Sequence, residues 1–232
     1  MQTKHLAIGI VLLCCGLAPD AYAENTYPAM APVTQYLIAN RADEIALARS
    51  AAPASISGDA TILTLGSHGF ETAVTGKNGF VCFVERSWDS DFDAPEFWNW
   101  HIRGPDCFNA AAVRSVVPEY LERAKWVLAG ASKAVMIART KAAFAAKTFV
   151  APEPGAMCFM MSKQQYLSDN GGEHGWHPHL MFFVPHTEPA EWGADAKGSP
   201  VIAGQMNLEH VTIMMVPVAK WSDGTSAVME MK

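Results

Sequence analysis

Several features that would point directly to a function are scarce or missing in this chain. Basic residues are not in excess, because 17 Lys and Arg stand against 23 Asp and Glu and the formal net charge is −6. A nucleic-acid binder uses an excess of Lys and Arg to displace phosphate counterions. No apolar run beyond the N-terminal segment approaches the roughly 20 residues of a membrane-spanning helix. We therefore expect no nucleic-acid partner and, after loss of that segment, no stable insertion in a membrane.

The short motifs of common enzyme classes are also missing. The sequence contains no G-x-S-x-G nucleophile elbow and no H-E-x-x-H metal motif. It contains neither G-x-G-x-x-G nor a P-loop, so nucleotide binding has no support. No C-x-x-C spacing occurs, which argues against a redox pair or a zinc knuckle. These absences leave open whether the protein is an enzyme at all.

The N-terminus has the three parts of a secretory signal peptide. Lys4 supplies a positive start, residues 6–17 form a short apolar centre, and residues 21–23 read Ala-Tyr-Ala, an A-x-A cleavage site. An uncleaved anchor fits less well because the apolar run is short. Acylation at Cys15 fits less well because a cysteine precedes it where a small residue is expected. We predict that residues 1–23 are cleaved and that residues 24–232 form one exported domain, in the periplasm or the extracellular medium.

Three cysteines remain after signal cleavage, and an oxidising compartment favours a disulfide between two of them. All three pairings among Cys82, Cys107 and Cys158 are open. Cys158 lies in an apolar run typical of a buried strand, where a free cysteine behaves as a small hydrophobic residue. Cys107 follows a Gly-Pro-Asp loop. These features favour a Cys82–Cys107 disulfide.

Apolar patterning predicts two groups of strands with helices between them. We expect strands over residues 60–65, 70–75, 80–86, 156–161, 179–184 and 210–218, and helices over 32–50, 110–129 and 133–147. The turn residues 76–79 predict a tight hairpin. Because strands and helices do not alternate, we expect an α+β fold. Its mainly antiparallel sheet would combine the two strand clusters, with the α-helical insert packed on it.

One run in the first strand group carries a resemblance. Residues 78–86, Asn-Gly-Phe-Val-Cys-Phe-Val-Glu-Arg, are similar to the N-G-F-x-C-x-V-E-R signature of a group of uncharacterised secreted bacterial proteins. Residues 106–110 and residues 178–183, the latter with a P-H-x-M-F pattern, resemble further blocks of that group. The resemblance covers residues 45–218 in scattered blocks. It implies export and supports the Cys82–Cys107 pair, and it implies no activity.

The densest polar segment is residues 173–179, Glu-His-Gly-Trp-His-Pro-His. In an extended chain, His177 and His179 point to the same face, so both imidazoles could reach one ion. Glu173 or His174 could add a third ligand, and three protein ligands with an open position suit a zinc-dependent hydrolase. The alternatives are structural or solvent-facing histidines, and acid–base chemistry without a metal.

An acidic stretch between the strand groups carries three tryptophans, Trp88, Trp98 and Trp100. Their rings could stack on a ligand, and core packing is the alternative. Taken with the missing motifs, the sequence favours an exported domain that binds a small molecule or a protein partner. A metal-dependent, hydrolase-like enzyme that uses the histidine cluster at residues 174–179 is the alternative function, with zinc as its cofactor.

Overall fold

The computed structural model of the chain describes residues 27–169 and 176–227. The predicted signal peptide at residues 1–23 lies outside the described residues. Two members of the predicted metal set, Glu173 and His174, also lie outside them.

Eight strands form one sheet. They are β1 (Thr61–Gly66), β2 (Gly69–Val74), β3 (Val81–Glu85), β4 (Gly104–Phe108), β5 (Met157–Met160), β6 (His179–Pro185), β7 (Ile202–Met206) and β8 (Val211–Pro217). Their order across the sheet is β2-β1-β3-β4-β5-β6-β8-β7. Only the β1–β3 pair is parallel, so the sheet is mainly antiparallel. The predicted α+β class with a mainly antiparallel sheet is confirmed.

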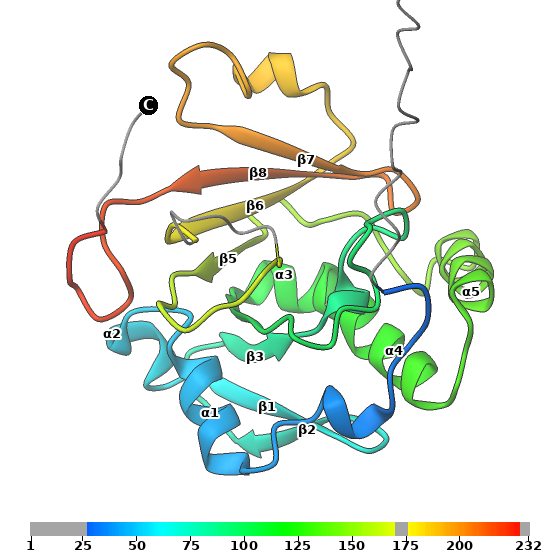
Figure 1. Cartoon of the computed structure of the whole chain (residues 1–232). Coiled ribbons are helices and arrows are strands. Elements are labelled where there is room, and N and C mark those ends of the chain that lie inside the picture. The colour runs from blue at the N-terminus through cyan, green and yellow to red at the C-terminus, as the bar shows by residue number, and fades with distance from the viewer. Residues whose placement is uncertain (1–26, 170–175, 228–232) are drawn as a thin grey trace, which may run out of the picture.

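Helices cover both faces of this sheet. They are α1 (Arg41–Arg49), α2 (Ala54–Ser57), α3 (Ala110–Ser115), α4 (Val117–Leu128) and α5 (Lys133–Ala145), with the 3-10 turns η1 (Val33–Gln35), η2 (Ser87–Asp89) and η3 (Pro189–Trp192). Figure 1 shows α1 in front of the sheet and α3 and α4 behind it, with β2 at the bottom and β7 at the top. We call these two sides the α1 face and the α4 face.

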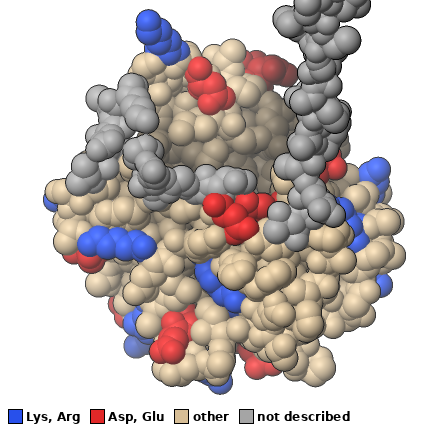
Figure 2. Space-filling view, viewed as in Figure 1, with Lys and Arg blue, Asp and Glu red and all other residues tan. Residues whose placement is uncertain are grey.

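Two observations describe the exterior of the molecule. Within the part of the chain that the structure describes, no helix has the length and apolarity needed to cross a membrane. On the side drawn in Figure 2, Lys and Arg side chains are scattered among other residues rather than gathered into a basic patch.

The hairpin predicted at residues 76–79 is wrong. β2 pairs with β1, and β1 pairs in parallel with β3, so the chain crosses the start of β1, where Lys77 N–H donates to the Asp59 carbonyl, instead of turning back beside β2. Gly79 does adopt a positive φ of 79°. The Asn78 amide donates to the Ile56 carbonyl at 2.7 Å, and its oxygen accepts from the Phe80 backbone N–H at 3.1 Å. The turn therefore ties the crossing segment to α2.

Other local expectations need correction. The helix expected over residues 32–50 is two elements, η1 and α1, because extended Asn40 caps α1 and accepts a hydrogen bond from Ala42 N–H at 2.9 Å. The sequence indicated no strand at β4, because Gly-Pro-Asp is typical of a loop. It also indicated no strand at β7. The helix expected over residues 110–129 is also two elements, α3 and α4, and Pro118 stands in the first turn of α4.

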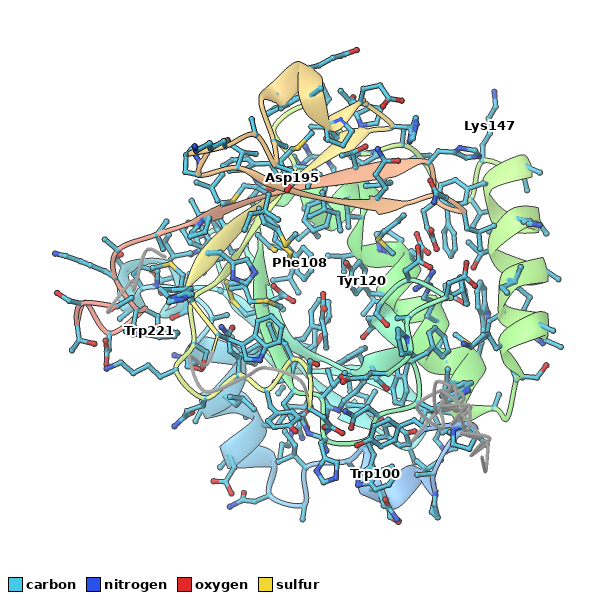
Figure 3. All side chains as sticks on the ribbon, turned by 45° about the horizontal axis from the view of Figure 1, so that its top comes forward. Trp100, Phe108, Tyr120, Lys147, Asp195 and Trp221 are labelled. Carbon is cyan, nitrogen blue, oxygen red and sulfur yellow. A yellow bond between two sulfur atoms is a disulfide. The ribbon has the colours of Figure 1, made fainter. Side chains whose placement is uncertain are left out.

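Strand alternation gives each face its own core. The core of the α1 face includes Ile62, Cys82, Val84 and Cys107. The core of the α4 face includes Phe83, Phe108, Met181, Phe183 and Tyr120. Figure 3 labels two of these, Phe108 from β4 and Tyr120 from α4, whose rings lie in the interior with centroids 5.4 Å apart. The side chains of β3 and β4 thus decide what each layer of helices meets.

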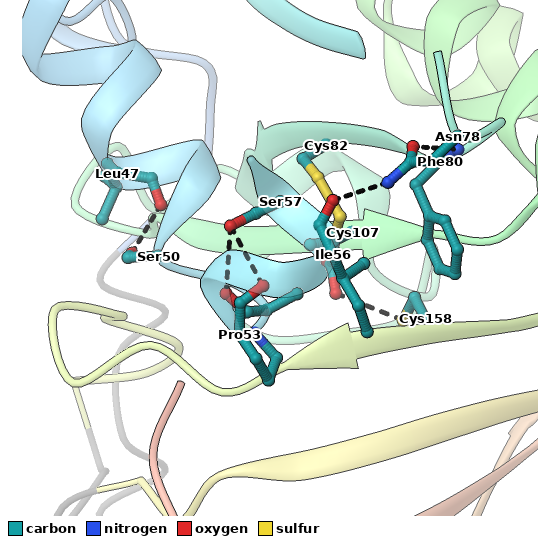
Figure 4. Close-up of a disulfide and its surroundings, with 12 residues drawn as sticks. Leu47, Ser50, Pro53, Ile56, Ser57, Asn78, Phe80, Cys82, Cys107 and Cys158 are labelled. Atoms are coloured by element: carbon teal, nitrogen blue, oxygen red, sulfur yellow. Dashed lines mark hydrogen bonds between the residues drawn. A yellow bond between two sulfur atoms is a disulfide. The ribbon is translucent and has the colours of Figure 1, made fainter. Parts of the chain in front are cut away.

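A disulfide joins β3 to β4 on the α1 face. Cys82 and Cys107 are direct cross-strand partners with Cα atoms 4.0 Å apart. Figure 4 shows the bond between the two strands, close to Ile56 of α2. Cys158 is free and buried on β5. This is the pairing that the sequence favours among the three open ones.

Candidate functional site

The predicted metal set is only partly described. His179 begins β6, and its Nδ1 lies 2.9 Å from the His177 carbonyl oxygen, so the ring is held against its own backbone. Burial lowers the pKa of His179. Among residues 27–169 and 176–227, no three His, Cys, Asp or Glu side chains are placed to hold a metal ion. Because Glu173 and His174 lie outside these residues, the metal hypothesis stays a prediction.

The three tryptophans lie at different depths. Trp88 is fully buried and packs its ring 4.8 Å from that of Tyr36. Trp98 is also buried, in an edge contact with Phe97. Trp100 is half-buried and meets Tyr27 edge-on, at 5.2 Å between ring centroids. The structure therefore does not gather the three rings into one exposed stacking surface.

The α4 face contains a polar cluster that the sequence did not indicate. Five carboxyl groups converge there from different elements: Glu85 at the end of β3, Asp89 in η2, Asp106 in β4, Glu119 in α4 and Glu209 before β8. Arg123 on α4 is the cation in contact with this group. Carboxylates are rarely buried unless they are paired, so this excess of acid needs a physical explanation.

Two of the carboxyls share a proton beneath the helices. Glu85 and Asp106 lie on the same face of β3 and β4 and are hydrogen-bonded to each other. Cys158 also donates from Sγ to Asp106 Oδ1 at 3.3 Å. Burial raises the pKa of both carboxyls because the charged form loses hydration. At neutral pH we therefore expect Glu85 to keep the proton that it donates to Asp106.

The second pair is bound to Arg123. The Nε of Arg123 faces Glu119 Oε1 at 3.0 Å, one turn away on α4, and its Nη2 forms an ion pair with Glu209. Glu119 and Glu209 are also hydrogen-bonded to each other, and burial raises the pKa of both. Arg123 Nη1 donates to the carbonyl oxygens of Trp88 and Ser90. The two terminal nitrogens of this guanidinium group are therefore hydrogen-bonded, whereas Nε contacts Glu119 without a hydrogen bond.

A narrow cavity opens beside this second pair, and we call it the acidic cavity. Its polar wall is formed by Asp89, Ser115, Glu119, Tyr120, Arg123 and Glu209. Its apolar wall is formed by Val116, Phe144, Val150, Pro152, Phe183, Met206 and Val211. With its mouth the cavity encloses about 390 Å³, whereas the space open to the centres of water molecules is about 20 Å³. That smaller volume is room for one or two waters.

Asp89 has an unpaired oxygen at this wall. Its Oδ2 accepts from the Arg86 backbone N–H at 3.0 Å, whereas its Oδ1 has no hydrogen-bond donor among the described residues. The residue is only 4% exposed, and burial raises the pKa of Asp89 to about 7. Asp89 can therefore hold or release a proton near neutral pH, and it can accept a hydrogen bond from a bound group.

Parts of this site had a signal in the sequence. The alternation of β3 places Glu85 on the same face as Phe83, which marks a carboxyl directed to the core. Glu119 and Arg123 have the i,i+4 spacing of an ordinary surface ion pair, so their burial was not evident. Asp106 and Glu209 join the cluster only through the sheet order, which the sequence did not indicate.

The assignment of this site rests on its geometry. The resemblance to a group of secreted bacterial proteins stays a prediction. No family model matches the chain, and no curated protein and no solved structure matches it either.

Proposed function

We propose that the protein is an exported binding domain that takes a small molecule into the acidic cavity. The observation that carries this proposal is the unpaired Oδ1 of Asp89 at the cavity wall. A buried acceptor without a donor costs about 1–3 kcal/mol. A ligand that donates a hydrogen bond to Asp89 would recover this cost, which gives the cavity a reason to bind.

The state of the other polar groups favours binding over catalysis by a nucleophile. Ser115, the serine in the wall, donates to the Ala111 carbonyl at 2.8 Å and accepts from the Glu153 N–H at 3.0 Å. An activated nucleophile instead needs a base within hydrogen-bond reach of its hydroxyl group. Ser115 therefore supports the wall, and the unpaired Oδ1 of Asp89 is a group available to a ligand.

Two features support export. The Cys82–Cys107 bond is of the kind that persists in oxidising compartments. The sequence of residues 1–23, with its A-x-A site, fits a cleaved secretory signal. The proposal places the mature domain in the periplasm or the extracellular medium.

A metal-dependent enzyme is the second candidate, and one observation favours it. The Nδ1 of His179 faces the His177 carbonyl, which is the arrangement that orients a ligating histidine and leaves Nε2 for a metal. Metal analysis of untagged protein tests this candidate. Stoichiometric zinc that disappears in the His177→Ala/His179→Ala variant would support it, and zinc-free protein from zinc-supplemented medium would exclude it.

A ligand screen on the mature chain tests the binding proposal. Val150 is 45% exposed and lines the cavity, so Val150→Trp should block the mouth with little effect on folding. Val135 on α5 is 41% exposed and does not line the cavity, so Val135→Trp is the matched control. We expect compounds detected by ligand-observed NMR to bind the wild type and Val135→Trp but not Val150→Trp. Ligands that bind all three proteins equally would place the binding site elsewhere.

A further inference from the structure

The chemistry of the acidic cavity restricts its ligand to a hydrogen-bond donor. Arg123 uses Nη2 on Glu209 and Nη1 on two backbone carbonyls, and its Nε lies 3.0 Å from Glu119 Oε1 in an ion pair without a hydrogen bond. An anion in the cavity would therefore find one guanidinium donor, Nε, which already faces the Glu119 carboxyl, whereas Asp89 Oδ1 is an acceptor without a hydrogen-bond partner. The site is short of donors rather than of acceptors.

Charge leads to the same class of ligand. Asp89, Glu119 and Glu209 place three carboxyls at the cavity wall against the single guanidinium of Arg123. The other groups facing Asp89 are Arg86, which is paired with Glu44, and the carboxyls of Asp106 and Glu85. A bound monocation would compensate part of this excess, whereas a neutral donor would not.

The shape of the cavity adds a size limit. The whole space open to the centres of water molecules admits only one or two of them, so one –NH₃⁺ group fills it and a substituent has to extend into the mouth. The apolar residues that line the cavity, Phe183, Met206 and Val211 among them, offer contact to such a carbon substituent. A quaternary ammonium group has no N–H and is larger, so it satisfies neither condition.

We propose that the ligand of the acidic cavity is a small primary ammonium compound with a short apolar substituent. Its –NH₃⁺ group donates to Asp89 Oδ1, and its carbon chain lies against Phe183 and Met206. This inference rests on the proposed binding function and names the chemical class of its ligand.

Binding of an ammonium ion is coupled to ionisation of Asp89. In the empty protein, burial raises the pKa of Asp89 to about 7, so the group is partly protonated at neutral pH. An ammonium ion favours the carboxylate, and binding therefore releases a proton. Affinity should rise with pH, by up to about tenfold between pH 6 and pH 8, if Asp89 alone titrates. A neutral donor such as an alcohol should not show this increase.

The experiment is an NMR titration of the mature protein at constant ionic strength with three probes. They are n-butylammonium, its neutral analogue 1-butanol, and tetramethylammonium. We expect n-butylammonium to bind at least tenfold more tightly than either of the others at pH 8. Its affinity should fall at pH 6.

Substitutions test whether n-butylammonium binds at Asp89 in the acidic cavity. Asp89→Asn keeps an oxygen for the Arg86 N–H and should reduce n-butylammonium affinity at least tenfold and remove its pH dependence. Asp91→Asn removes the same charge two residues away, outside the cavity wall. It should leave the affinity for n-butylammonium and its pH dependence nearly unchanged. Val150→Trp should abolish binding of n-butylammonium.

Three outcomes would overturn the inference. They are n-butylammonium binding no tighter than 1-butanol, equal affinity in Asp89→Asn and wild type, and no binding by any probe. If 1-butanol binds and Val150→Trp blocks it while n-butylammonium does not bind, the cavity still binds ligands but its ligand is not an ammonium compound. This result separates failure of the ammonium proposal from failure of the proposed binding function.

Discussion

Each face of the sheet buries one guanidinium group, and the two groups differ in their surroundings. On the α1 face, Arg86 donates to Glu44 at 2.8 Å and to the Tyr36 carbonyl at 2.7 Å, and Glu44 also accepts from the Leu65 N–H. One acid there balances one base. On the α4 face, Arg123 is in contact with Glu119 and Glu209, and Asp89 stands beside them with an unpaired oxygen.

On this difference we base a structural role for the Arg86 pair and the proposed functional role for the cluster around Arg123. A buried ion pair is tolerated when its charges balance and its hydrogen bonds are complete, as around Arg86. Excess buried carboxyls must instead hold protons, and strongly shifted pKa values of this kind gather at functional sites. The α4 face therefore buries more carboxyl groups than its single guanidinium group can balance.

The largest expected effect comes from breaking the ion pair between Arg86 and Glu44. Arg86→Met leaves Glu44 buried without its cation, and we expect a loss of about 3–5 kcal/mol in the free energy of unfolding. The measurement is guanidinium denaturation at pH 7. The double variant Glu44→Leu/Arg86→Met should lose less than the sum of the two single variants. Simple additivity would mean that the pair does not act as a unit.

Removal of the disulfide should have the next largest effect. The Cys82–Cys107 bond closes a loop with a sequence separation of 25 residues. The chain-entropy relation gives about 3.5 kcal/mol for such a loop. We expect this loss for Cys82→Ala/Cys107→Ala in denaturant unfolding, and a smaller one for the control Cys158→Ser, which keeps a donor for Asp106. Equal losses in the two variants would contradict the contribution of loop closure.

The smallest expected effect is a pH dependence on the α4 face. The pKa of Asp89 is raised from 3.8 to about 7, so the folded state holds more protons than the unfolded state between these values. Stability must then fall as pH rises through about 7. Asp89→Asn should remove this fall and gain about 2–3 kcal/mol relative to wild type between pH 5 and pH 8. The same difference at both pH values would show that Asp89 does not titrate there.

Local patterning explains how much of the fold could be predicted. The residues of β3 and β6 follow the alternating or continuous apolar patterns of strands. Ser132 caps α5 by accepting a hydrogen bond from the Val135 N–H, so these elements were predictable. Gly104 and Pro105 resemble a turn, yet both are buried within a central strand because neighbouring strands pair on each side. Sheet order depends on such contacts over long sequence separation, which a local pattern does not contain.

The candidate site was less predictable than the fold for the same reason. The histidines of residues 174–179 form a recognisable candidate site because they are close together in the sequence. Asp89, Glu119 and Glu209 are far apart in the sequence, and each is unremarkable among its neighbours. They meet because η2, α4 and the segment before β8 converge on one sheet face.

The bond between Cys82 and Cys107 has a consequence on the side of the sheet away from it. It fixes which residue of β3 stands opposite which residue of β4. A slip by one position would turn the side chains of one strand to the other side, which would part Glu85 from Asp106. A covalent link made in an oxidising environment therefore secures the alignment that lets two acids share a proton on the opposite side.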